Sequence, residues 1–292
     1  MRVTEGMRYS QVLNNLANIN SQHAQAAQEA SSGIRVGKPS DDPIAAAELA
    51  RLSASSSQTK AQLSTIDTVR GDAELTESTL ADASDIFVRL KELALQGANG
   101  GLTAEERSTI GVEVSGLKEA LLSLSNARGT RGYLFSGTQV TTPAFDGNGV
   151  FQGNDQAHVV GIGNSTPTAV STSGADSFVV AGGRNVFADL DSLATALSNN
   201  DEAGIRGSID DIDLARGQLV NARAKAGLIL SKLDASQSVL TSLDTQQQKT
   251  AQTAGAADPY ESYTRVTTLG QTLDRAIAVS KQILDIGNSN RF

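Results

Sequence analysis

Ser40-Asp41-Asp42-Pro43 opens the stretch of sequence that decides the fold, and that stretch continues to Gln96. Its first four residues supply a side-chain oxygen for capping, acidic groups where a helix dipole is positive, and a proline whose missing N–H costs nothing in a first turn. One glycine, Gly71, and no further proline follow before Gly97. The sequence therefore predicts a single helix of about 54 residues, roughly 80 Å long, which needs a long partner.

The long partner is predicted from Glu202 to Lys249. Apolar residues recur along both segments at helical spacing, which is typical of a coiled coil or helical bundle. The first stripe is weak from Ser53 to Gln62, where polar residues replace most of it. We expect the two segments to lie antiparallel along most of their length. The first stripe is Leu49, Leu52, Leu63, Ile66, Ala73, Leu80, Phe87, Leu90 and Ala94, and the second is Ile205, Ile209, Ile212, Leu219, Ala222, Ala226, Ile229, Leu233, Leu240 and Leu243.

Two further helices and a β-rich insertion are predicted between the long segments. Thr103-Ala104-Glu105-Glu106 has the pattern of a capping box, so a helix starts there and folds back as an antiparallel hairpin. Beyond Thr138, small polar residues dominate and helical periodicity is lost until helix returns at Val186 to Leu197. The β-prone runs in the insertion are residues 150–152, 158–162, 169–172 and 177–180.

Thin apolar stripes mark both ends of the chain. One helix is expected over residues 9–30 and another from Pro259 to near the end, each with a stripe too narrow to be stable alone in water. We expect association to order them, so their apolar residues form the candidate self-assembly interface. Joints connect them to the long helices, one around Pro39 and one over residues 250–259. The interface residues are Leu13, Leu16, Ile19, Leu269, Leu273, Ile277, Ile283 and Leu284, and the helix-start and joint residues are Pro39, Ser40, Asp41, Asp42 and Pro43.

The predicted fold class is mainly α, with a long antiparallel coiled-coil or helical-bundle rod built from the N- and C-terminal regions and a small inserted β domain. Residues 1–42 and 254–292 form the terminal helices, partly disordered in the monomer. Residues 43–138 and 184–253 form the rod, and residues 139–183 form the β domain.

Composition excludes several classes of protein. With 39% hydrophobic residues, 4% aromatic residues and no tryptophan, the chain of 292 residues suits a rod better than a compact enzyme. A net charge of −8 argues against nucleic acid and anionic membrane as partners. No apolar run reaches 18 residues, and residues 1–30 lack a signal-peptide core, so neither a membrane span nor a cleavable signal is predicted.

No catalytic, cofactor or metal site is predicted. Cysteine is absent, which removes thiolate nucleophiles and sulfur-ligated metals. His23 and His158 fall in different segments without metal-ligand spacing, so they read as helix-surface and strand residues. Asp41 and Asp42 precede a proline, which favours capping over paired acid–base chemistry. The glycine-rich residues 147–153 lack the lysine of a phosphate loop.

Several motifs resemble segments of the bacterial flagellin family, and the match covers nearly the whole chain. Within that family the resemblance is to the hook–filament junction proteins, because filament flagellin usually lacks the second proline, Pro43. At the C-terminal end, Asp258-Pro259-Tyr260-Glu261 departs from the family's D-x-D-Y-A. The motifs are Ser31-Ser32-Gly33-Ile34-Arg35 (S-S/T-G-x-R), Pro39-Ser40-Asp41-Asp42-Pro43-Ile44-Ala45-Ala46 (P-S-D-D-P-x-A-A), Gly132-Tyr133-Leu134-Phe135-Ser136-Gly137 (Y-x-F-x-G), Thr142-Pro143-Ala144-Phe145 (T-x-P-F) and Phe151-Gln152-Gly153-Asn154 (Y-x-G-D).

The resemblance implies a non-enzymatic structural adaptor that assembles as a ring between hook and filament. It implies export through the flagellar channel without a cleaved signal, an extracellular location, an outward-facing β domain, and contacts with the hook-side junction protein and flagellin. An export chaperone would be a further partner. Two alternatives stay open: the filament subunit itself, and a cytoplasmic coiled-coil protein that binds a protein partner.

Overall fold

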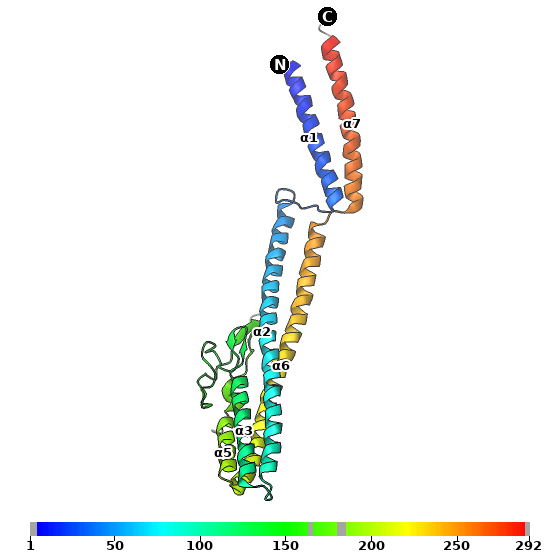
Figure 1. Ribbon diagram of the computed structural model, residues 1–292. Coiled ribbons are helices and arrows are strands. Elements are labelled where there is room, and N and C mark those ends of the chain that lie inside the picture. The colour runs from blue at the N-terminus through cyan, green and yellow to red at the C-terminus, as the bar shows by residue number, and fades with distance from the viewer. Residues whose placement is uncertain (1–4, 163–165, 180–184, 290–292) are drawn as a thin grey trace. The chain divides into compact units, whose positions relative to one another are not determined.

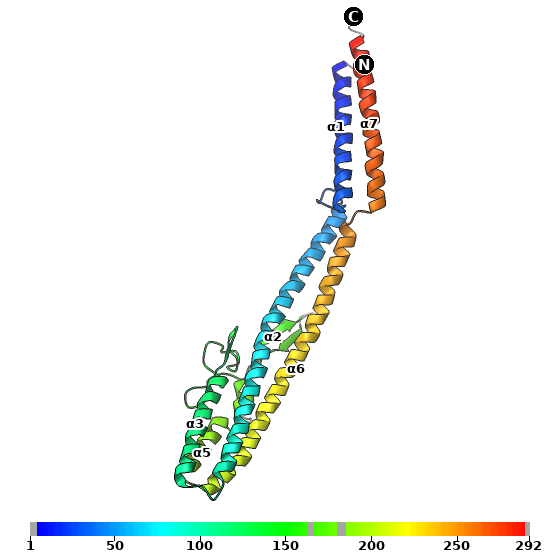
Figure 2. The same ribbon diagram turned by 45° about the vertical axis from the view of Figure 1, so that its right-hand side comes forward.

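The computed structural model describes residues 5–162, 166–179 and 185–289, and these are mainly helical (Figures 1 and 2). Contacts divide the chain into two compact units: the terminal unit, Met1–Gln58 with Asp244–Phe292, and the bundle unit, Thr59–Leu243. Along the chain the elements are α1 (Glu5–Ser32), α2 (Pro43–Gly97), α3 (Ala104–Ser125), β1 (Arg128–Gly129), β2 (Gly132–Tyr133), β3 (Val159–Ile162), β4 (Thr166–Ala169), α4 (Gly174–Phe178), α5 (Val186–Ser198), α6 (Glu202–Gly255) and α7 (Pro259–Ser289).

In the bundle unit, α2 and α6 run antiparallel. Lys91 Nζ lies 2.7 and 2.8 Å from the two carboxylate oxygens of Asp213, and Arg223 Nε lies 2.6 Å from a carboxylate oxygen of Glu77. Residue numbers therefore fall along α6 as they rise along α2, and the ribbons follow the same course (Figures 1 and 2). The predicted long helix and its long partner are both confirmed.

Helices α3 and α5 complete a four-helix bundle with α2 and α6. Arg89 of α2 pairs with Glu113 of α3 at 2.7 Å, so α3 folds back along α2 as predicted. The capping box is present: Glu106 N donates to Thr103 Oγ1 at 3.3 Å, and Thr103 N donates to the Glu106 carboxylate at 2.7 Å. Helix α5 packs against α3. The connections from α2 to α3 and from α5 to α6 are short, as is typical of antiparallel neighbours in a helical bundle.

The main core of the bundle unit ends in a cluster of aromatic rings. Leucine, alanine, isoleucine and valine side chains from the four helices fill most of this core. Five of the chain's seven phenylalanines then meet one another, with ring centroids 5.2–6.2 Å apart. Concentrating scarce rings at one place anchors the irregular segment after α3 to the helices. The five are Phe135, Phe145, Phe151, Phe178 and Phe187.

A second, smaller core holds the antiparallel β3–β4 hairpin against the long helices. Val170, directly after β4, is fully buried with Ile66 and Val69 of α2 and Leu233 of α6. Val160 of β3 packs against the same cluster. A two-stranded hairpin is marginal by itself, so this packing is what keeps it folded.

The insertion carries less β structure than the composition suggested. The predicted run 158–162 is confirmed as β3, whereas the run 150–152 makes only the isolated bridge between Phe145 and Phe151. The run 169–172 begins at the last residue of β4. Two-residue strands β1 and β2, outside every predicted run, pair after α3.

The predicted strand at residues 177–180 is wrong for Ser177 and Phe178, and Val179 makes only an isolated antiparallel bridge with Asn185. Residue 180 lies outside the described residues, and Ser177 and Phe178 belong to helix α4. Ser173 Oγ accepts from Ala175 N at 3.1 Å and so caps this short helix. Phe178 is buried among the aromatic rings, and tertiary packing of that ring outweighs its β propensity.

One glycine of the segment after α3 is fixed by its backbone. Gly137 has φ +67°, and a Cβ atom at this position would lie 2.1 Å from the backbone oxygen of Asn154. Only glycine adopts this conformation with so close an approach. The glycine that ends the Tyr133–Gly137 motif is therefore a structural requirement of the turn.

In the terminal unit, α1 and α7 lie side by side and antiparallel (Figures 1 and 2). The first turns of α2 and the last turns of α6 also meet there through polar groups: Ser56 Oγ donates to Asp244 at 2.5 Å, and Gln247 Nε2 donates to Ser55 Oγ at 2.8 Å. These contacts fall where the apolar stripe of α2 was predicted to be weak.

The joint predicted at residues 250–259 is shorter than expected, because α6 continues to Gly255. Glutamine, threonine and alanine in this stretch tolerate helix, and packing extends it. A Cβ atom on Gly255 would come within 3.4 Å of Leu49, so the end of α6 lies close against α2. The connection to α7 is therefore only residues 256–258.

Candidate functional site

The two joints of the chain are tied to each other inside the terminal unit. Ile34 and Ala256 form an antiparallel bridge. Arg35 N donates to Gly255 O at 2.8 Å, and Ala257 N donates to Gly33 O at 2.9 Å. The connection from α1 to α2 and the connection from α6 to α7 thus share backbone hydrogen bonds, which keeps the two terminal helices together at this end.

Arg35 and Asp42 reinforce the joint with side chains. One guanidinium nitrogen of Arg35 lies 2.8 Å from the Asp42 carboxylate, and the other donates to Ala254 O at 3.1 Å. Asp42 also accepts from Ile44 N at 3.1 Å and Ala45 N at 3.0 Å, so it is the residue that caps α2. One carboxylate therefore starts the long helix and holds the arginine that reaches the end of α6.

The other predicted joint residues surround this cap. Asp41 Oδ2 accepts from Gly37 N at 3.2 Å and Lys38 N at 3.0 Å and closes the loop before the helix. Pro39 and Ser40 lie exposed in the turn, and Pro43 is the first helical residue. The structure thus places the five residues in one helix-start motif, with Asp42 rather than Ser40 as the cap.

Acid should loosen the start of α2. The Ala45 backbone N–H and then the Arg35 side chain lower the pKa of Asp42 below its ordinary value of 3.8. A carboxyl group with a lowered pKa stabilises the folded state above its unfolded pKa, and this contribution is lost as the pH falls below about 4. Amide hydrogen exchange of residues 44–48 should therefore speed up below pH 4, after correction for the intrinsic rate.

The Asp42→Asn variant is the matched control, because asparagine still caps a helix but has no acidic proton to titrate. Its exchange over residues 44–48 should not change in this way with pH. Equal acid sensitivity in the variant would contradict the assignment to Asp42.

Among the described side chains, helices α1 and α7 cover each other closely only near the joint. Ala26 of α1 and Ser262 of α7 are buried there. Arg265 pairs with Glu29 at 3.3 Å, and Gly270 lies beside the His23 ring, where a Cβ atom would make an ordinary contact at 3.5 Å from His23 Nε2. Small residues thus allow close packing at one end of the pair.

Farther from the joint, the predicted interface residues are only partly covered. We call this set the terminal seam. Leu13 is 48% exposed and Ile277 is 38% exposed, while the other four members are half-buried. Ile283 and Leu284 belong to α7, but they lie outside the residues whose side chains the structure describes. The terminal seam comprises Leu13, Leu16 and Ile19 of α1 and Leu269, Leu273 and Ile277 of α7.

Sequence reasoning missed part of the exposed apolar surface beside the seam. Tyr260 is 87% exposed, and it borders a shallow groove of about 530 Å³ with Gln22, Arg265 and Leu269. Val279 of α7 is also exposed. Helical spacing could have found Val279, but Tyr260 lies in the first turn of α7, where the sequence was interpreted as a helix start.

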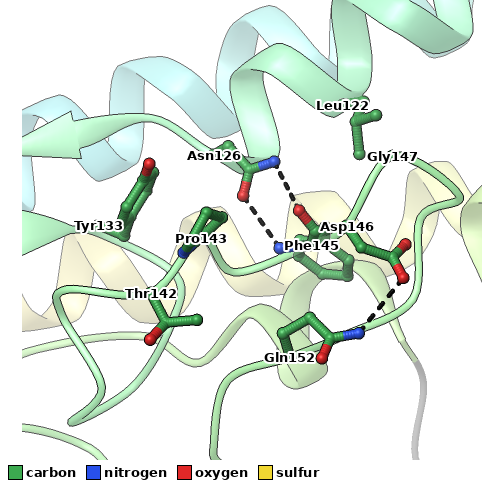
Figure 3. A pocket seen from close by; sticks show the side chains of 9 residues that line it. All are labelled: Leu122, Asn126, Tyr133, Thr142, Pro143, Phe145, Asp146, Gly147 and Gln152. Atoms are coloured by element: carbon green, nitrogen blue, oxygen red, sulfur yellow. Dashed lines mark hydrogen bonds between the residues drawn. The ribbon is translucent and has the colours of Figure 1, made fainter.

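A second depression, of about 640 Å³, lies in the bundle unit below the end of α3 (Figure 3). The Asn126 amide donates to Phe145 O and accepts from Phe145 N, both at 2.9 Å. Asp146 accepts from Asn148 N and Val150 N at 2.9 Å and from Gln152 Nε2 at 3.3 Å. These polar groups form hydrogen bonds with other residues of the segment 126–152. Their role is therefore to fix the conformation of this loop, and they are not free to act on a bound molecule.

The remaining lining agrees with that interpretation. Tyr133, Thr142 and Pro143 form one side of the depression and Leu122 the other (Figure 3). The Tyr133 ring also stacks under the Arg128 guanidinium, 4.6 Å from its carbon. Nothing in this set combines a nucleophile with a general base.

Over residues 5–162, 166–179 and 185–289, no group of three or more histidine, aspartate or glutamate side chains is arranged to hold a metal ion. Within the same part of the chain, no helix has the length and apolar character needed to cross a bilayer.

Comparison with known proteins points to the flagellum. Residues 3–140 match the family described as bacterial flagellin N-terminal helical region. Flagellar hook-associated protein 3 of Salmonella typhimurium is 25% identical over 180 residues, covering 61% of this chain and 57% of that protein. The protein of the same name in Escherichia coli is 26% identical over 261 residues, covering 84% and 82%.

The fold has a solved counterpart. The structure of a flagellar hook-associated protein from Vibrio parahaemolyticus superposes with a TM-score of 0.69 at 24% identity, and covers 73% of this chain and 99% of that one. At this identity the likeness speaks for the fold. The comparisons agree with one another: residues 3–140 match the bacterial flagellin N-terminal helical region, and the chain is similar in sequence and fold to flagellar hook-associated proteins.

Proposed function

We propose that this protein is a structural adaptor of the bacterial flagellum that assembles as a ring at the hook–filament junction. The observation that carries the proposal is the terminal seam, whose apolar side chains stay partly exposed after α1 and α7 have paired. Apolar surface in a row along a helix pair is stabilised when another molecule covers it. A ring of identical subunits, each covering the seam of the next, would do this.

The filament subunit is the second candidate, since it belongs to the same family. The Asp42-Pro43 helix start and the Tyr133–Gly137 motif favour the junction protein, and both of the relatives described above carry the name hook-associated protein 3. A cytoplasmic coiled-coil partner protein is a weaker candidate. A role as an enzyme lacks any supporting constellation among the described side chains.

Immunogold labelling of purified hook–filament structures separates the candidates. Label confined to the distal end of the hook is the expected result, and label along the filament would instead identify the filament subunit. Deleting the gene gives an independent test. The mutant should keep its hook and shed filament subunit into the medium, whereas loss of the filament subunit leaves none to shed.

The remaining parts of the proposal concern partners and location. We propose contact with the hook-side junction protein on one side and flagellin on the other, export to the cell exterior, and an export chaperone before assembly. Recovering the protein in sheared flagella tests the location. Mass spectrometry of that material tests whether residues 1–30 are retained after export.

We also propose a division of the chain into three parts with different roles. The assembly part is residues 1–42 and 254–292, the rod is residues 43–138 and 184–253, and the inserted β domain is residues 139–183. Limited proteolysis of the monomer should remove the terminal parts first and leave residues 43–249 intact. The rod is expected to resist because its helices share a buried core, whereas the terminal pair buries little. Early cleavage within Glu202–Lys249 would contradict this division.

A further inference from the structure

His158 occupies a position at the base of the β3–β4 hairpin where its charge would affect docking. Its backbone joins the two sides of the hairpin: Val170 N donates to His158 O at 2.8 Å, and His158 N donates to Ser171 Oγ at 2.8 Å. Val170 in turn fills the small core with α2 and α6. Whatever moves His158 therefore also moves the residue that anchors the hairpin.

The imidazole ring belongs to a half-buried residue that borders a small cavity. Its Nε2 atom is buried and finds no hydrogen-bond partner among the described residues. A cavity of about 20 Å³ separates it from its neighbours, which is room for about one water molecule. The cavity is lined by Asp72 and Thr76 of α2, Arg131 and Tyr133 of the β1–β2 segment, and Val170 and Ser171 after β4.

The charges around the ring favour its neutral form. Asp72 is the only carboxylate that lines the cavity, and it is already engaged by Thr130 N and Arg131 Nε, both at 2.7 Å. Arg131 adds a positive charge beside the ring, and Tyr133 also lines the cavity. A second positive charge on His158 would be placed next to Arg131, beside a carboxylate that two other groups already engage.

Burial and then the Arg131 charge lower the pKa of His158 below its ordinary value of 6.5, against smaller opposing effects of a hydrogen bond to the Gly137 backbone and of the Asp72 charge. For a histidine with a lowered pKa, the folded arrangement has its full stability above the unfolded pKa. It loses stability as the pH falls below 6.5, because the undocked state then binds the proton more tightly.

We propose that His158 is a proton-sensitive latch, and that its protonation releases the base of the β3–β4 hairpin from the α2–α6 pair. Release withdraws Val170 and Val160 from the small core. Ile66, Val69 and Leu233 then lose the side chains that cover them. The latch thus couples a proton to the exposure of an apolar patch in the bundle unit, and it does not depend on the proposed junction role.

The test combines two measurements on the full chain between pH 7.5 and 5. The imidazole signals are titrated by NMR and assigned with a His23→Gln variant, since the chain has two histidines. Hydrogen exchange is followed at the Val170 amide and corrected for intrinsic rates. The NMR titration gives the proton affinity of His158 in the docked hairpin, which is weaker than that of an exposed histidine. As the pH falls, protection of the Val170 amide should decrease by the factor that this difference in proton affinity sets.

Two variants sharpen the result. His158→Gln cannot take up a proton, so its hairpin protection should stay constant over this range, whereas His23→Gln should keep the wild-type response. A His158 signal that titrates at or above pH 6.5, or protection that does not change with pH in the wild type, would overturn the proposal. The proposal would also be overturned if hairpin protection in His158→Gln fell with pH as it does in the wild type. The titration uses the native chain, so the test stands even if the glutamine variant folds poorly.

Discussion

Glutamates at Leu13 and Ile277 should abolish assembly while leaving the monomer folded. Both side chains are substantially exposed on α1 and α7, so the monomer loses little when they change. Glutamate is also a good helix former, and both helices should persist. In an assembled ring each carboxylate would be buried without a partner, at a cost of about 3–5 kcal/mol. Even 3 kcal/mol lowers an association constant by more than about a hundredfold.

The measurement is swimming motility of a deletion strain that carries the Leu13→Glu/Ile277→Glu chain, together with circular dichroism of the purified monomer. We expect motility to be lost and helicity to be retained. The matched control is Leu13→Met/Ile277→Leu, which changes shape at the same two positions but keeps both apolar, and it should support near-normal motility. Normal motility in the glutamate variant would remove the terminal seam from the assembly interface.

Replacing Arg107 with alanine should destabilise the bundle unit by about 3–5 kcal/mol. Arg107 is only 2% exposed, although it is charged and lies in the first turns of α3. Its guanidinium donates to Gly97 O at 2.9 Å, to Asn99 O at 2.8 Å and to Asn200 Oδ1, and pairs with Glu202 at 2.8 Å. One side chain therefore joins the end of α2 to the start of α6. Alanine would remove the arginine donor from the carbonyl of Gly97, a buried residue, and break the other three contacts.

Urea denaturation followed by circular dichroism measures this loss as a lower midpoint with an unchanged slope. Arg206→Ala is the matched control, because Arg206 also pairs with Glu202, at 3.5 Å, but is largely exposed. Its removal should cost within about 1 kcal/mol. Arg107→Lys should also be destabilised, since an ammonium group cannot reproduce the planar fork. Equal midpoints for Arg107→Ala and Arg206→Ala would show that the buried network adds nothing.

Local signals predicted the helices well where capping and periodicity agree. Pro43 and the Thr103 capping box start their helices where the pattern placed them, because both act through groups within one turn. The end of α6 was predicted too early, since Gln and Thr residues give no stop signal and the nearby Leu49 contact is not visible in a linear sequence. Residues 174–178 became helix for a similar reason: their surroundings are aromatic rings from distant segments.

The candidate site divides in the same way. The apolar members of the terminal seam could be predicted from spacing alone, but which of them α7 or α1 leaves uncovered depends on packing. Asp42 could be assigned to the helix start from its neighbours in the sequence. Its link through Arg35 to Ala254 could not be predicted, because Ala254 is far away in the chain. His158 carried no sequence signal, since the burial and the Arg131 charge that lower its pKa arise only from packing.

Spacing, caps and composition within short windows are enough to predict a mainly helical chain with two long antiparallel helices, a polar insertion and two thin apolar stripes at its ends. Three features follow from packing alone: Arg107 is buried, the scarce phenylalanines gather in one core, and the terminal pair leaves its seam partly exposed. The burial and the electrostatic environment of a side chain depend on residues that are distant in the sequence and become neighbours only on folding. Local sequence patterns therefore do not predict them.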